Sequence, residues 1–379
     1  MILDFEVETM KIKKIVLRKM EMALKVSFET SFAAMKTKKF IVVEIHSKDH
    51  IGYGECSALA APWYSEETTD TAWANIEKFL IPILFSNQDI SCPEKIQDDF
   101  KWIRRNKMAK AAIDCALWDL YAKENNISLA KALGGTRSEI ETGVSLGIQK
   151  NPDELLYMVD RYINEGYRRI KVKIKPAKDL HYLSVVRKEF GDITLMADAN
   201  SAYTLADMDL FKQIDDLNLL MIEQPLANDD IIDHAKLQKE LRTKICLDES
   251  IESVEDARKA IELGSMKTIN IKVARVGGLT EAKKIHDLCQ ENNIPVWCGG
   301  MLDAGIARAH NIAIASLPNY KFPGDVPASN RYYANDFMSA PVTINKKAMI
   351  KVPLEIGIGI EPVQTLLDSF TFEKKEFLR

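Results

Sequence analysis

Four short stretches decide how the centre of this chain folds: RRIKVKI (168–174), ITLMAD (193–198), LLMIEQ (219–224) and KICLDE (244–249). Each is rich in apolar and β-branched residues, and polar or charged residues stand at or near its end, which is typical of a buried strand that meets a loop. Helical patterns separate the four stretches. Strands that alternate with helices predict parallel pairing, because each right-handed crossover needs a helix to return the chain to the sheet.

The same alternation extends in both directions along the chain. Further strand-like runs are TGVSLGI (142–148), KTINIKV (267–273), IPVWCGG (294–300) and IAIAS (312–316). Eight such strands predict an α/β fold that closes into a (β/α)8-type barrel, a modified TIM barrel. A doubly wound open sheet is the alternative.

The two ends of the chain have a different texture. The first hundred residues carry short β-rich runs, and an amphipathic helix follows at 109–121. The last fifty residues return to strand-like runs, which we expect to fold back onto the N-terminal strands. We therefore predict an α+β domain at 1–135, the barrel with the active site at 136–325, and a C-terminal segment at 326–379 that rejoins the first domain.

Composition excludes several classes of protein. The 379 residues include 51 basic and 55 acidic side chains, and a net charge of −4 gives no basic footprint for nucleic acid or an anionic membrane. We find no apolar run of the length that a membrane helix needs. The N-terminus carries acids where a signal peptide carries basic residues, and the six cysteines form no C-x-x-C pair. We expect a cytoplasmic protein with reduced thiols.

Charged residues follow the predicted strands at nearly constant spacing. Lys173, Asp198, Glu223, Asp248 and Lys272 are separated by 25, 25, 25 and 24 residues, about one strand–helix unit each. In a barrel this spacing places the five side chains at the same mouth, where barrel enzymes keep their active sites. A single strand that ends in an acid is unremarkable, but five consecutive strand ends of this kind are not explained by solvation.

Three of these residues are carboxylates that would repel one another at a common mouth. Asp198, Glu223 and Asp248 are all hard oxygen donors, and neither His nor Cys is among them. This donor set suits Mg²⁺, or Mn²⁺ in its place. We predict that the three carboxylates are metal ligands.

The lysines indicate the purpose of such a metal. Lys173 and Lys272 come from the second and sixth strands, on different sides of the ring, and Lys171 points to the same face of its strand as Lys173. Beside a divalent cation and another ammonium group, the neutral amine of a lysine becomes available as a base. Two bases and a Lewis acid predict removal of a proton next to a carboxylate, with an enediolate as the product of that step.

These residues stand in motifs that resemble the enolase superfamily, in its muconate-lactonising subgroup. The motifs are Lys171-Val172-Lys173, Asp198-Ala199-Asn200, Glu223-Gln224-Pro225, Asp248-Glu249-Ser250 and Asn270-Ile271-Lys272. The resemblance implies a barrel that is capped by an α+β domain built from the N-terminus and the extreme C-terminus. It also implies a lysine base that acts with Mg²⁺.

A finer resemblance covers most of the chain. MADANSAYTLAD (196–207), MIEQPLANDD (221–230), KVARVGGL (272–279) and FPGD (322–325) are similar to the o-succinylbenzoate synthase / N-succinylamino acid racemase family. That family implies dehydration of a cyclohexadiene carboxylate in menaquinone biosynthesis, and in some members racemisation of N-succinylated amino acids. We expect a small-molecule carboxylate substrate and a homo-oligomer.

The family resemblance also implies roles for individual residues. Lys173 is expected to take the α-proton, and Lys272 to act as the opposing base in racemisation or as a cation that faces the ring in dehydration. Asn200 is expected near the substrate carboxylate or the metal. Arg275 resembles an arginine of racemase-competent members. Asp303 departs from the family, which more often has Glu there.

Other readings remain open at this point. Muconate cycloisomerase uses the same carboxylates and lysines, and a barrel that has lost catalysis is a further alternative. A dipeptide epimerase is disfavoured, because that group places Asp-x-Asp at the end of the last barrel strand, where this chain has Ala315-Ser316-Leu317-Pro318-Asn319.

Weaker signals concern lids, anions and histidines. Residues 24–35, a long connection between two predicted strands with Phe28, Phe32 and Met35, are expected to close over the barrel mouth together with 58–64. Gly277-Gly278 could bind a substrate anion or make a tight turn. His310 is expected to be a satisfied helix residue, whereas His181, His234 and His286 are expected to be solvated.

Overall fold

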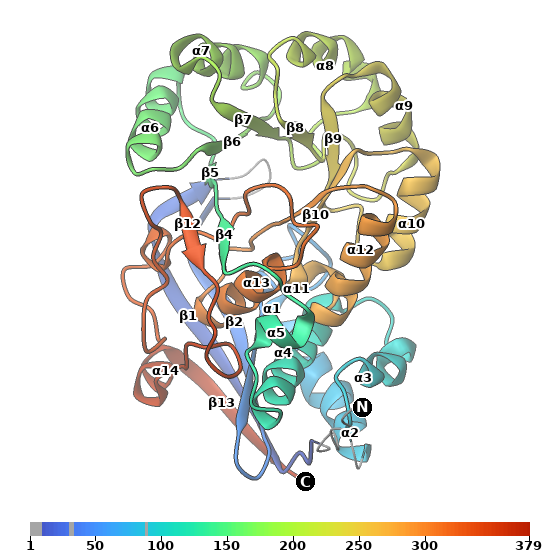
Figure 1. The fold of residues 1–379 in the computed structure, drawn as a ribbon, viewed down its shortest axis with the longest axis vertical. Coiled ribbons are helices and arrows are strands. Elements are labelled where there is room, and N and C mark those ends of the chain that lie inside the picture. The colour runs from blue at the N-terminus through green and yellow to red at the C-terminus, as the bar shows by residue number, and fades with distance from the viewer. Residues whose placement is uncertain (1–9, 30–33, 88–89) are drawn as a thin grey trace, which may run out of the picture.

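The protein is described by a computed structural model that covers residues 10–29, 34–87 and 90–379. Figure 1 shows a curved parallel sheet with outer helices above an antiparallel sheet with its own helices. The two parts correspond to the predicted barrel and α+β domain, which we call the capping domain. The boundaries predicted at 135 and 325 stay a prediction.

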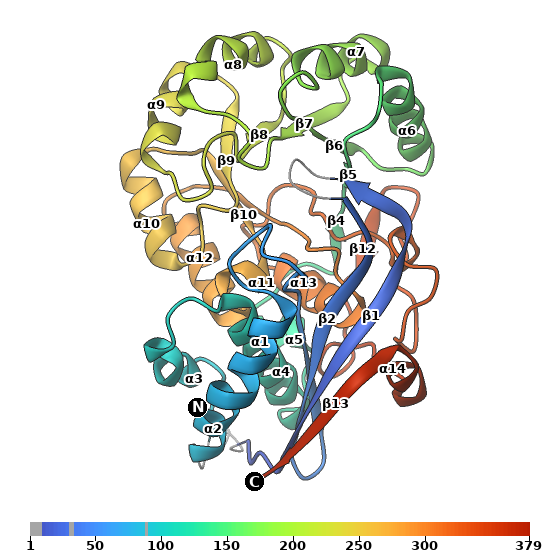
Figure 2. The ribbon, with the colours of Figure 1, turned by 180° about the vertical axis from the view of Figure 1, so that it is seen from behind.

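The capping domain is built on a four-stranded antiparallel sheet in the order β13-β1-β2-β3. Its strands are β1 (Lys14–Glu29), β2 (Ala34–His46), β3 (Ile51–Cys56) and β13 (Thr371–Leu378). Figure 2 shows β13 beside β1, in a register that pairs Lys14 with Leu378. The C-terminus therefore returns to the N-terminal strands, as predicted.

The strands β1 and β2 are longer than the sequence predicts. Residues 24–29 and 34–35, expected in a long connection, continue the two strands as a hairpin arm, with Phe28 paired with Met35. The arm reaches from the capping sheet to the barrel mouth, where the backbone N–H of Ile148 donates to the carbonyl of Glu29 at 3.2 Å. Phe32 lies outside the described residues.

The long helix α4 (Lys107–Glu124) packs against β3. Gly54 permits this close approach, because a Cβ atom there would lie 1.9 Å from the carbonyl oxygen of Ala112. The other cap elements are short: α1 (Thr69–Asn75), a π-helix (Ile76–Leu80), α2 (Ile81–Ser86), α3 (Lys95–Asp99), a 3₁₀ turn (Phe100–Trp102), α5 (Leu129–Leu133) and α14 (Gln364–Phe370).

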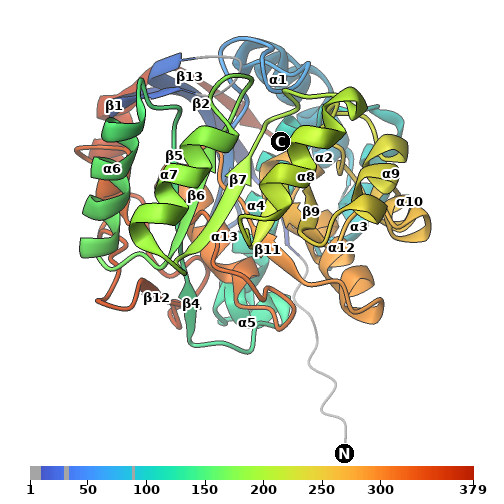
Figure 3. The same ribbon diagram turned by 90° about the horizontal axis from the view of Figure 1, so that it is seen from above.

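The barrel sheet has seven parallel strands in the sequential order from β5 to β11. They are β5 (Val144–Leu146), β6 (Arg169–Lys173), β7 (Thr194–Asp198), β8 (Met221–Glu223), β9 (Lys244–Leu247), β10 (Thr268–Ile271) and β11 (Val296–Cys298). Figure 3 shows outer helices around this sheet. They are α6 (Pro152–Asn164), α7 (Leu180–Phe190), α8 (Met208–Asp215), α9 (Ile232–Glu240), α10 (Val254–Leu263) and α12 (Leu279–Glu291).

The eighth predicted strand is wrong. Residues 312–316 belong almost entirely to α13 (Gly305–Ala315), and a segment without regular strand structure, 320–324, stands between β11 and β5. Isolated bridges join Tyr320 to Val296 and Gly324 to Thr142, so this segment links the two edges of the sheet. Pro323 within it has no N–H to donate, which prevents a continuous ladder. Seven strands and one irregular segment, residues 320–324, therefore close the barrel, and we call this segment the irregular stave.

Two buried carboxylates of the capping domain hold the ends of barrel helices. Glu55 of β3 accepts hydrogen bonds from the backbone N–H groups of Ala304 and Ala307 at the start of α13, at 3.1 and 3.0 Å. Asp114 of α4 accepts from the backbone and the hydroxyl of Thr280 at the start of α12, at 3.0 and 2.6 Å. Acids favour helix N-termini because unpaired N–H groups and the helix dipole meet there. These contacts fix the cap on the barrel.

Two further features bear on the class of protein. Among the described residues, none of the helices combines the length and apolar character that a bilayer span requires. All six cysteines are free thiols, and five of them are buried.

The fold depends on one carboxylate that joins three parts of the cap. Asp119 of α4 is fully buried and accepts from the backbone N–H groups of Tyr53 in β3 and of Ile358 in the C-terminal segment, both at 2.9 Å. We expect Asp119→Asn to lower the free energy of unfolding by about 1–3 kcal/mol, because one N–H would then face an amide donor. Denaturant titration measures this, and the exposed Asp192→Asn is the control. Equal midpoints for both variants would contradict the assignment.

Candidate active site

The predicted charged residues meet at the carboxyl ends of the barrel strands. In the sheet register Lys173 lies beside Asp198, and Asp198 beside Glu223. Asp248 follows β9 directly, and Lys272 follows β10. All five are at least nine-tenths buried. The spacing in the sequence therefore reflects five successive positions on one rim, as predicted.

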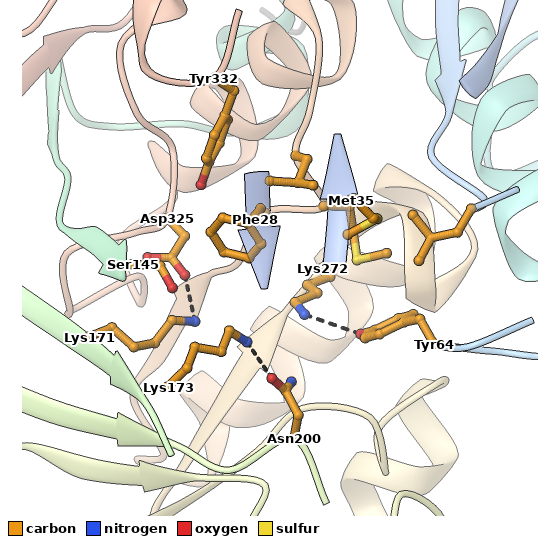
Figure 4. Close-up of a pocket in the computed structure, with 14 residues that line it drawn as sticks. Phe28, Met35, Tyr64, Ser145, Lys171, Lys173, Asn200, Lys272, Asp325 and Tyr332 are labelled. Carbon is orange, nitrogen blue, oxygen red and sulfur yellow. Dashed lines mark hydrogen bonds and ion pairs between the residues drawn. The ribbon is translucent and has the colours of Figure 1, made fainter. Parts of the chain in front are cut away.

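A pocket opens at this rim, between the barrel and the capping domain (Figure 4). The pocket and its open mouth together span about 580 Å³. Side chains from both domains line it: Phe28, Met35, Leu59, Tyr64, Ser145, Lys171, Lys173, Asn200, Lys272, Gly300, Met301, Leu302, Asp325 and Tyr332. The two stretches expected to close over the mouth thus contribute Phe28, Met35, Leu59 and Tyr64.

Lys173 points into the pocket from β6. Its ammonium group donates to Asp198 Oδ2 at 2.7 Å and to Asn200 Oδ1 at 2.5 Å. Although burial opposes ionisation of Asp198, Lys173 and Lys171 hold the pKa of this carboxyl below its ordinary value. The amine of Lys173 is therefore held at two points while it faces the space where a substrate would lie.

Lys171 is a permanently charged neighbour of Lys173. Its ammonium group lies 2.6 Å from Asp325 Oδ2, 3.0 Å from Glu223 Oε2 and 3.2 Å from Asp198 Oδ2. Burial alone would lower the pKa of Lys171, but Asp325 and the other two carboxylates outweigh it and raise the pKa above its ordinary value. Lys171 therefore supplies positive charge beside Lys173.

Lys272 enters the pocket from another side (Figure 4). Its ammonium group donates to Asp248 Oδ2 at 2.8 Å and to the hydroxyl of Tyr64 at 3.2 Å, and lies 4.7 Å from the centre of the Tyr64 ring. Burial opposes the charged form, but Tyr64 and nearby carboxylates, Glu249 first among them, raise the pKa of Lys272 above its ordinary value. In this structure Lys272 is a cation paired with Asp248.

Arg275 supports Asp248 and does not line the pocket. Its guanidinium forms an ion pair with Asp248 and donates to the backbone carbonyls of Ile251 at 2.8 Å and Asn270 at 2.5 Å. The side chain is 3% exposed. Arg275 thus fixes the carboxylate that holds Lys272.

The predicted metal ligands were tested against the geometry. Asp198, Glu223 and Asp248 are at most 1% exposed and supply only hard oxygen donors on neighbouring strand ends, which is the chemistry that Mg²⁺ requires. Each carboxylate faces an ammonium or guanidinium donor here. Within 10–29, 34–87 and 90–379, no group of three or more His, Cys, Asp or Glu is arranged so that it could hold a metal ion. The donor chemistry fits the metal, although in this structure the three carboxylates pair with cations and are not gathered around one point, and the ligand assignment stays a prediction.

Sequence reasoning did not identify several residues of the site. Asp325, directly after the irregular stave, pairs with Lys171 and lies 2.7 Å from Arg169. Gln224 accepts from the backbone N–H groups of Asp248 and Ser250 at 2.9 and 3.3 Å, so it fixes the loop after β9. Asp325 stands in the FPGD stretch and Gln224 in the Glu223-Gln224-Pro225 motif, so the family resemblance singled out both positions without indicating what either side chain contacts.

The seventh-strand position that departs from the family is explained by packing. Asp303 is buried and accepts from the backbone of Met301 at 3.0 Å and from the side chain of Asn311 at 2.9 Å. It does not line the pocket. Burial raises the pKa of its carboxyl. Asp303 therefore organises the turn before α13.

Gly278 and the three buried histidines have structural roles. A Cβ at Gly278 would lie 2.3 Å from the Asp114 carboxylate, which already occupies this helix start. His310 is buried, with Nδ1 2.9 Å from the carbonyl of Ile306 and Nε2 3.1 Å from that of Cys115, as expected of a satisfied residue. His181 is exposed, but the expectation of solvation is wrong for His234 and His286, which are buried and accept backbone hydrogen bonds.

The stretch used to disfavour a dipeptide epimerase lies in the wrong place. Residues 315–319 form the end of α13 and the turn that follows. The irregular stave is followed by Asp325-Val326-Pro327. This stretch has the first acid of an Asp-x-Asp pair and lacks the second. The second acid of the Asp-x-Asp pair of dipeptide epimerases is therefore missing at the position where the barrel closes.

Comparisons with known proteins agree with the geometry. Residues 12–134 match the mandelate racemase / muconate lactonizing enzyme N-terminal domain, and residues 154–366 match the enolase C-terminal domain-like family. The chain is 52% identical to an o-succinylbenzoate synthase of Geobacillus kaustophilus over 97% of this chain and 98% of that protein. It is 44% identical to an N-succinylamino acid racemase of Thermus thermophilus over 93% and 95% of the two chains.

A solved structure shows the same arrangement. An enolase superfamily member from Listeria innocua superposes with a TM-score of 0.94 at 45% identity, covering 97% of this chain and 99% of that chain. The chain therefore belongs to the mandelate racemase / muconate lactonizing enzyme family of the enolase superfamily, within the group of o-succinylbenzoate synthases and N-succinylamino acid racemases.

Proposed function

We propose that this chain is an o-succinylbenzoate synthase that also racemises N-succinylamino acids. One observation carries the proposal: the amines of Lys173 and Lys272 reach a single pocket from β6 and from the end of β10. The relatives named for the two activities support both reactions on this site.

Both reactions begin with the same step. Lys173, as the neutral amine, takes the proton next to the substrate carboxylate and leaves an enediolate. In dehydration, the ammonium group of Lys173 gives the abstracted proton to the hydroxyl on the neighbouring carbon, the C–O bond breaks, and water leaves. In racemisation, Lys272 returns a proton to the opposite face, and the roles reverse for the other enantiomer. Lys171 pairs with Asp198, which also holds Lys173, and Arg275 pairs with Asp248, which also holds Lys272.

Mg²⁺, or Mn²⁺ in its place, would be held by Asp198, Glu223 and Asp248. When bound, the cation supplies Lewis acidity that stabilises the negative charge formed after proton removal. The three carboxylates are paired with Lys171, Lys173 and Lys272 in this structure. Any carboxylate oxygen that binds a cation is less available to an ammonium group, so metal binding favours the neutral amine of the bases.

The substrate is a small carboxylate that fits between the two domains. Phe28, Met35 and Leu59 give the cap side of the pocket an apolar surface, and the barrel side carries the charged groups. A muconate cycloisomerase or dipeptide epimerase would use the same rim, and assays with their substrates discriminate. We further propose a cytoplasmic homo-oligomer; the free thiols agree with a reducing compartment.

The base assignment predicts different defects for the two lysines. Lys173→Ala should abolish both reactions, a loss of about 10²-fold or more, because it removes the amine that takes the α-proton. Lys272→Ala should abolish racemisation but retain α-proton exchange of one N-succinylamino acid enantiomer. Product formation and deuterium uptake in D₂O with Mg²⁺ measure this, and the exposed Lys267→Ala is the control. Exchange at the wild-type rate in Lys173→Ala would refute the assignment.

The metal assignment predicts an effect on stability as well as on activity. Mg²⁺ should raise the melting temperature of the wild type, since a cation that binds only the folded state at about 100 times its Kd adds about 2.7 kcal/mol. Glu223→Gln should lose most of this rise, whereas Asp192→Asn should keep it. Differential scanning fluorimetry measures the shift. Activity that survives EDTA, or an equal shift in both variants, would remove the metal role.

A further inference from the structure

Glu249 is a buried carboxylate of the barrel mouth that no step described so far uses. It follows Asp248, is 8% exposed, and does not line the pocket itself. Its Oε1 accepts a hydrogen bond from Nδ2 of Asn200 at 2.9 Å. Its Oε2 is buried and has no hydrogen-bond partner in the part of the chain that the structure describes.

Stability does not explain this carboxylate. Buried acids usually satisfy both oxygens, and a buried charge without full pairing destabilises the fold. The positive charge of Lys272 lies nearby, but the negative charges of Asp198 and Glu223 oppose that of Glu249. A side chain kept under these conditions, with a hydrogen bond from Asn200, points to a role in the site.

The partner of Glu249 holds the proposed base. Asn200 donates through Nδ2 to Glu249 and accepts through Oδ1 from the ammonium group of Lys173 at 2.5 Å. An amide that turned by 180° would present Nδ2 to this ammonium group, so two donors would face each other. The hydrogen bond to Glu249 selects the orientation in which Oδ1 faces Lys173.

Both ends of this chain of contacts are held rigidly. Asn200 has a left-handed backbone with φ +42°, and its backbone N–H donates to Asp198 Oδ1 at 3.1 Å. The backbone on either side of Glu249 is held by Gln224 through Asp248 and Ser250. The backbones of Asn200 and Glu249 are therefore both fixed, which a group that orients another side chain requires.

We propose that Glu249 is a positioning residue for Lys173 and acts through the amide of Asn200. This inference rests on the proposed function, in which Lys173 and Lys272 serve opposite faces of the substrate. It adds a requirement beyond the three proposed metal ligands: proton transfer on the Lys173 face depends on an acceptor at position 249. Asp248 and Tyr64 hold Lys272 by hydrogen bonds and Glu249 acts on it through charge, so the position of Lys272 depends less on that acceptor.

Face-specific exchange tests the proposal. The full-length protein with Mg²⁺ is incubated in D₂O with N-succinyl-L- and N-succinyl-D-amino acid separately, and α-deuterium is followed by NMR. The enantiomer whose exchange is lost in Lys173→Ala defines the Lys173 face. Glu249→Leu should slow exchange on that face about tenfold to a hundredfold, since a small misplacement of a catalytic group has an effect of that size. Exchange on the other face should fall less than about threefold.

Conservative and double variants exclude a general defect. Glu249→Gln keeps an oxygen that can accept from Asn200, so its exchange should stay within about threefold of wild type on both faces. Asn200→Ala and Asn200→Ala/Glu249→Leu should be equally slow, because Glu249 acts through the missing amide. If Glu249→Leu does not fold, Glu249→Ala replaces it under the same criteria.

The outcomes separate this inference from the proposed function. Lys173→Ala that still exchanges both enantiomers refutes the base assignment and the inference with it. Loss on one enantiomer in Lys173→Ala, together with equal slowing of both faces in Glu249→Leu, overturns the positioning role alone. A further loss in the double variant relative to Asn200→Ala also overturns it.

Discussion

The structure depends on the pairing of charged side chains that are buried at the barrel mouth. Five carboxylates and five cations meet at the barrel mouth, almost out of contact with water: Asp198, Glu223, Asp248, Glu249 and Asp325 with Arg169, Lys171, Lys173, Lys272 and Arg275. An isolated charge at this depth would destabilise the fold by several kcal/mol. Nine of these ten side chains face an opposite charge at hydrogen-bond distance, and Glu249 accepts a hydrogen bond from the amide of Asn200. The same pairing holds the proposed bases in position.

The capping domain is tied to the barrel by the same principle. Glu55 and Asp114 place negative charge at the starts of α13 and α12, where backbone N–H groups lack partners. These contacts bring Leu59, Tyr64 and the β1–β2 arm over the pocket. Tyr64 is the cap residue that touches a proposed base, since its hydroxyl accepts from Lys272. Both domains therefore line the one pocket in which the proposed bases lie.

One charged rim serves more than one reaction because the difficult step is common. Proton removal next to a carboxylate needs a base and stabilisation of the resulting charge, whatever follows. Dehydration then needs a leaving group, and racemisation needs a second base on the other face.

The linear sequence by itself determined the strand–helix alternation, the rim residues at intervals of about 25, and the family. Those features are local or periodic, and a period of one strand–helix unit survives folding unchanged. The tertiary structure decided what closes the barrel, because the irregular stave at 320–324 has no strand-like pattern, while 312–316, which has one, is helical. It also decided which groups pair: Asp325 with Lys171, Asn200 with Glu249, and the buried His234 and His286 with backbone N–H groups. Pairing of this kind depends on distances across the barrel between residues far apart in the chain, and sequence spacing does not contain them.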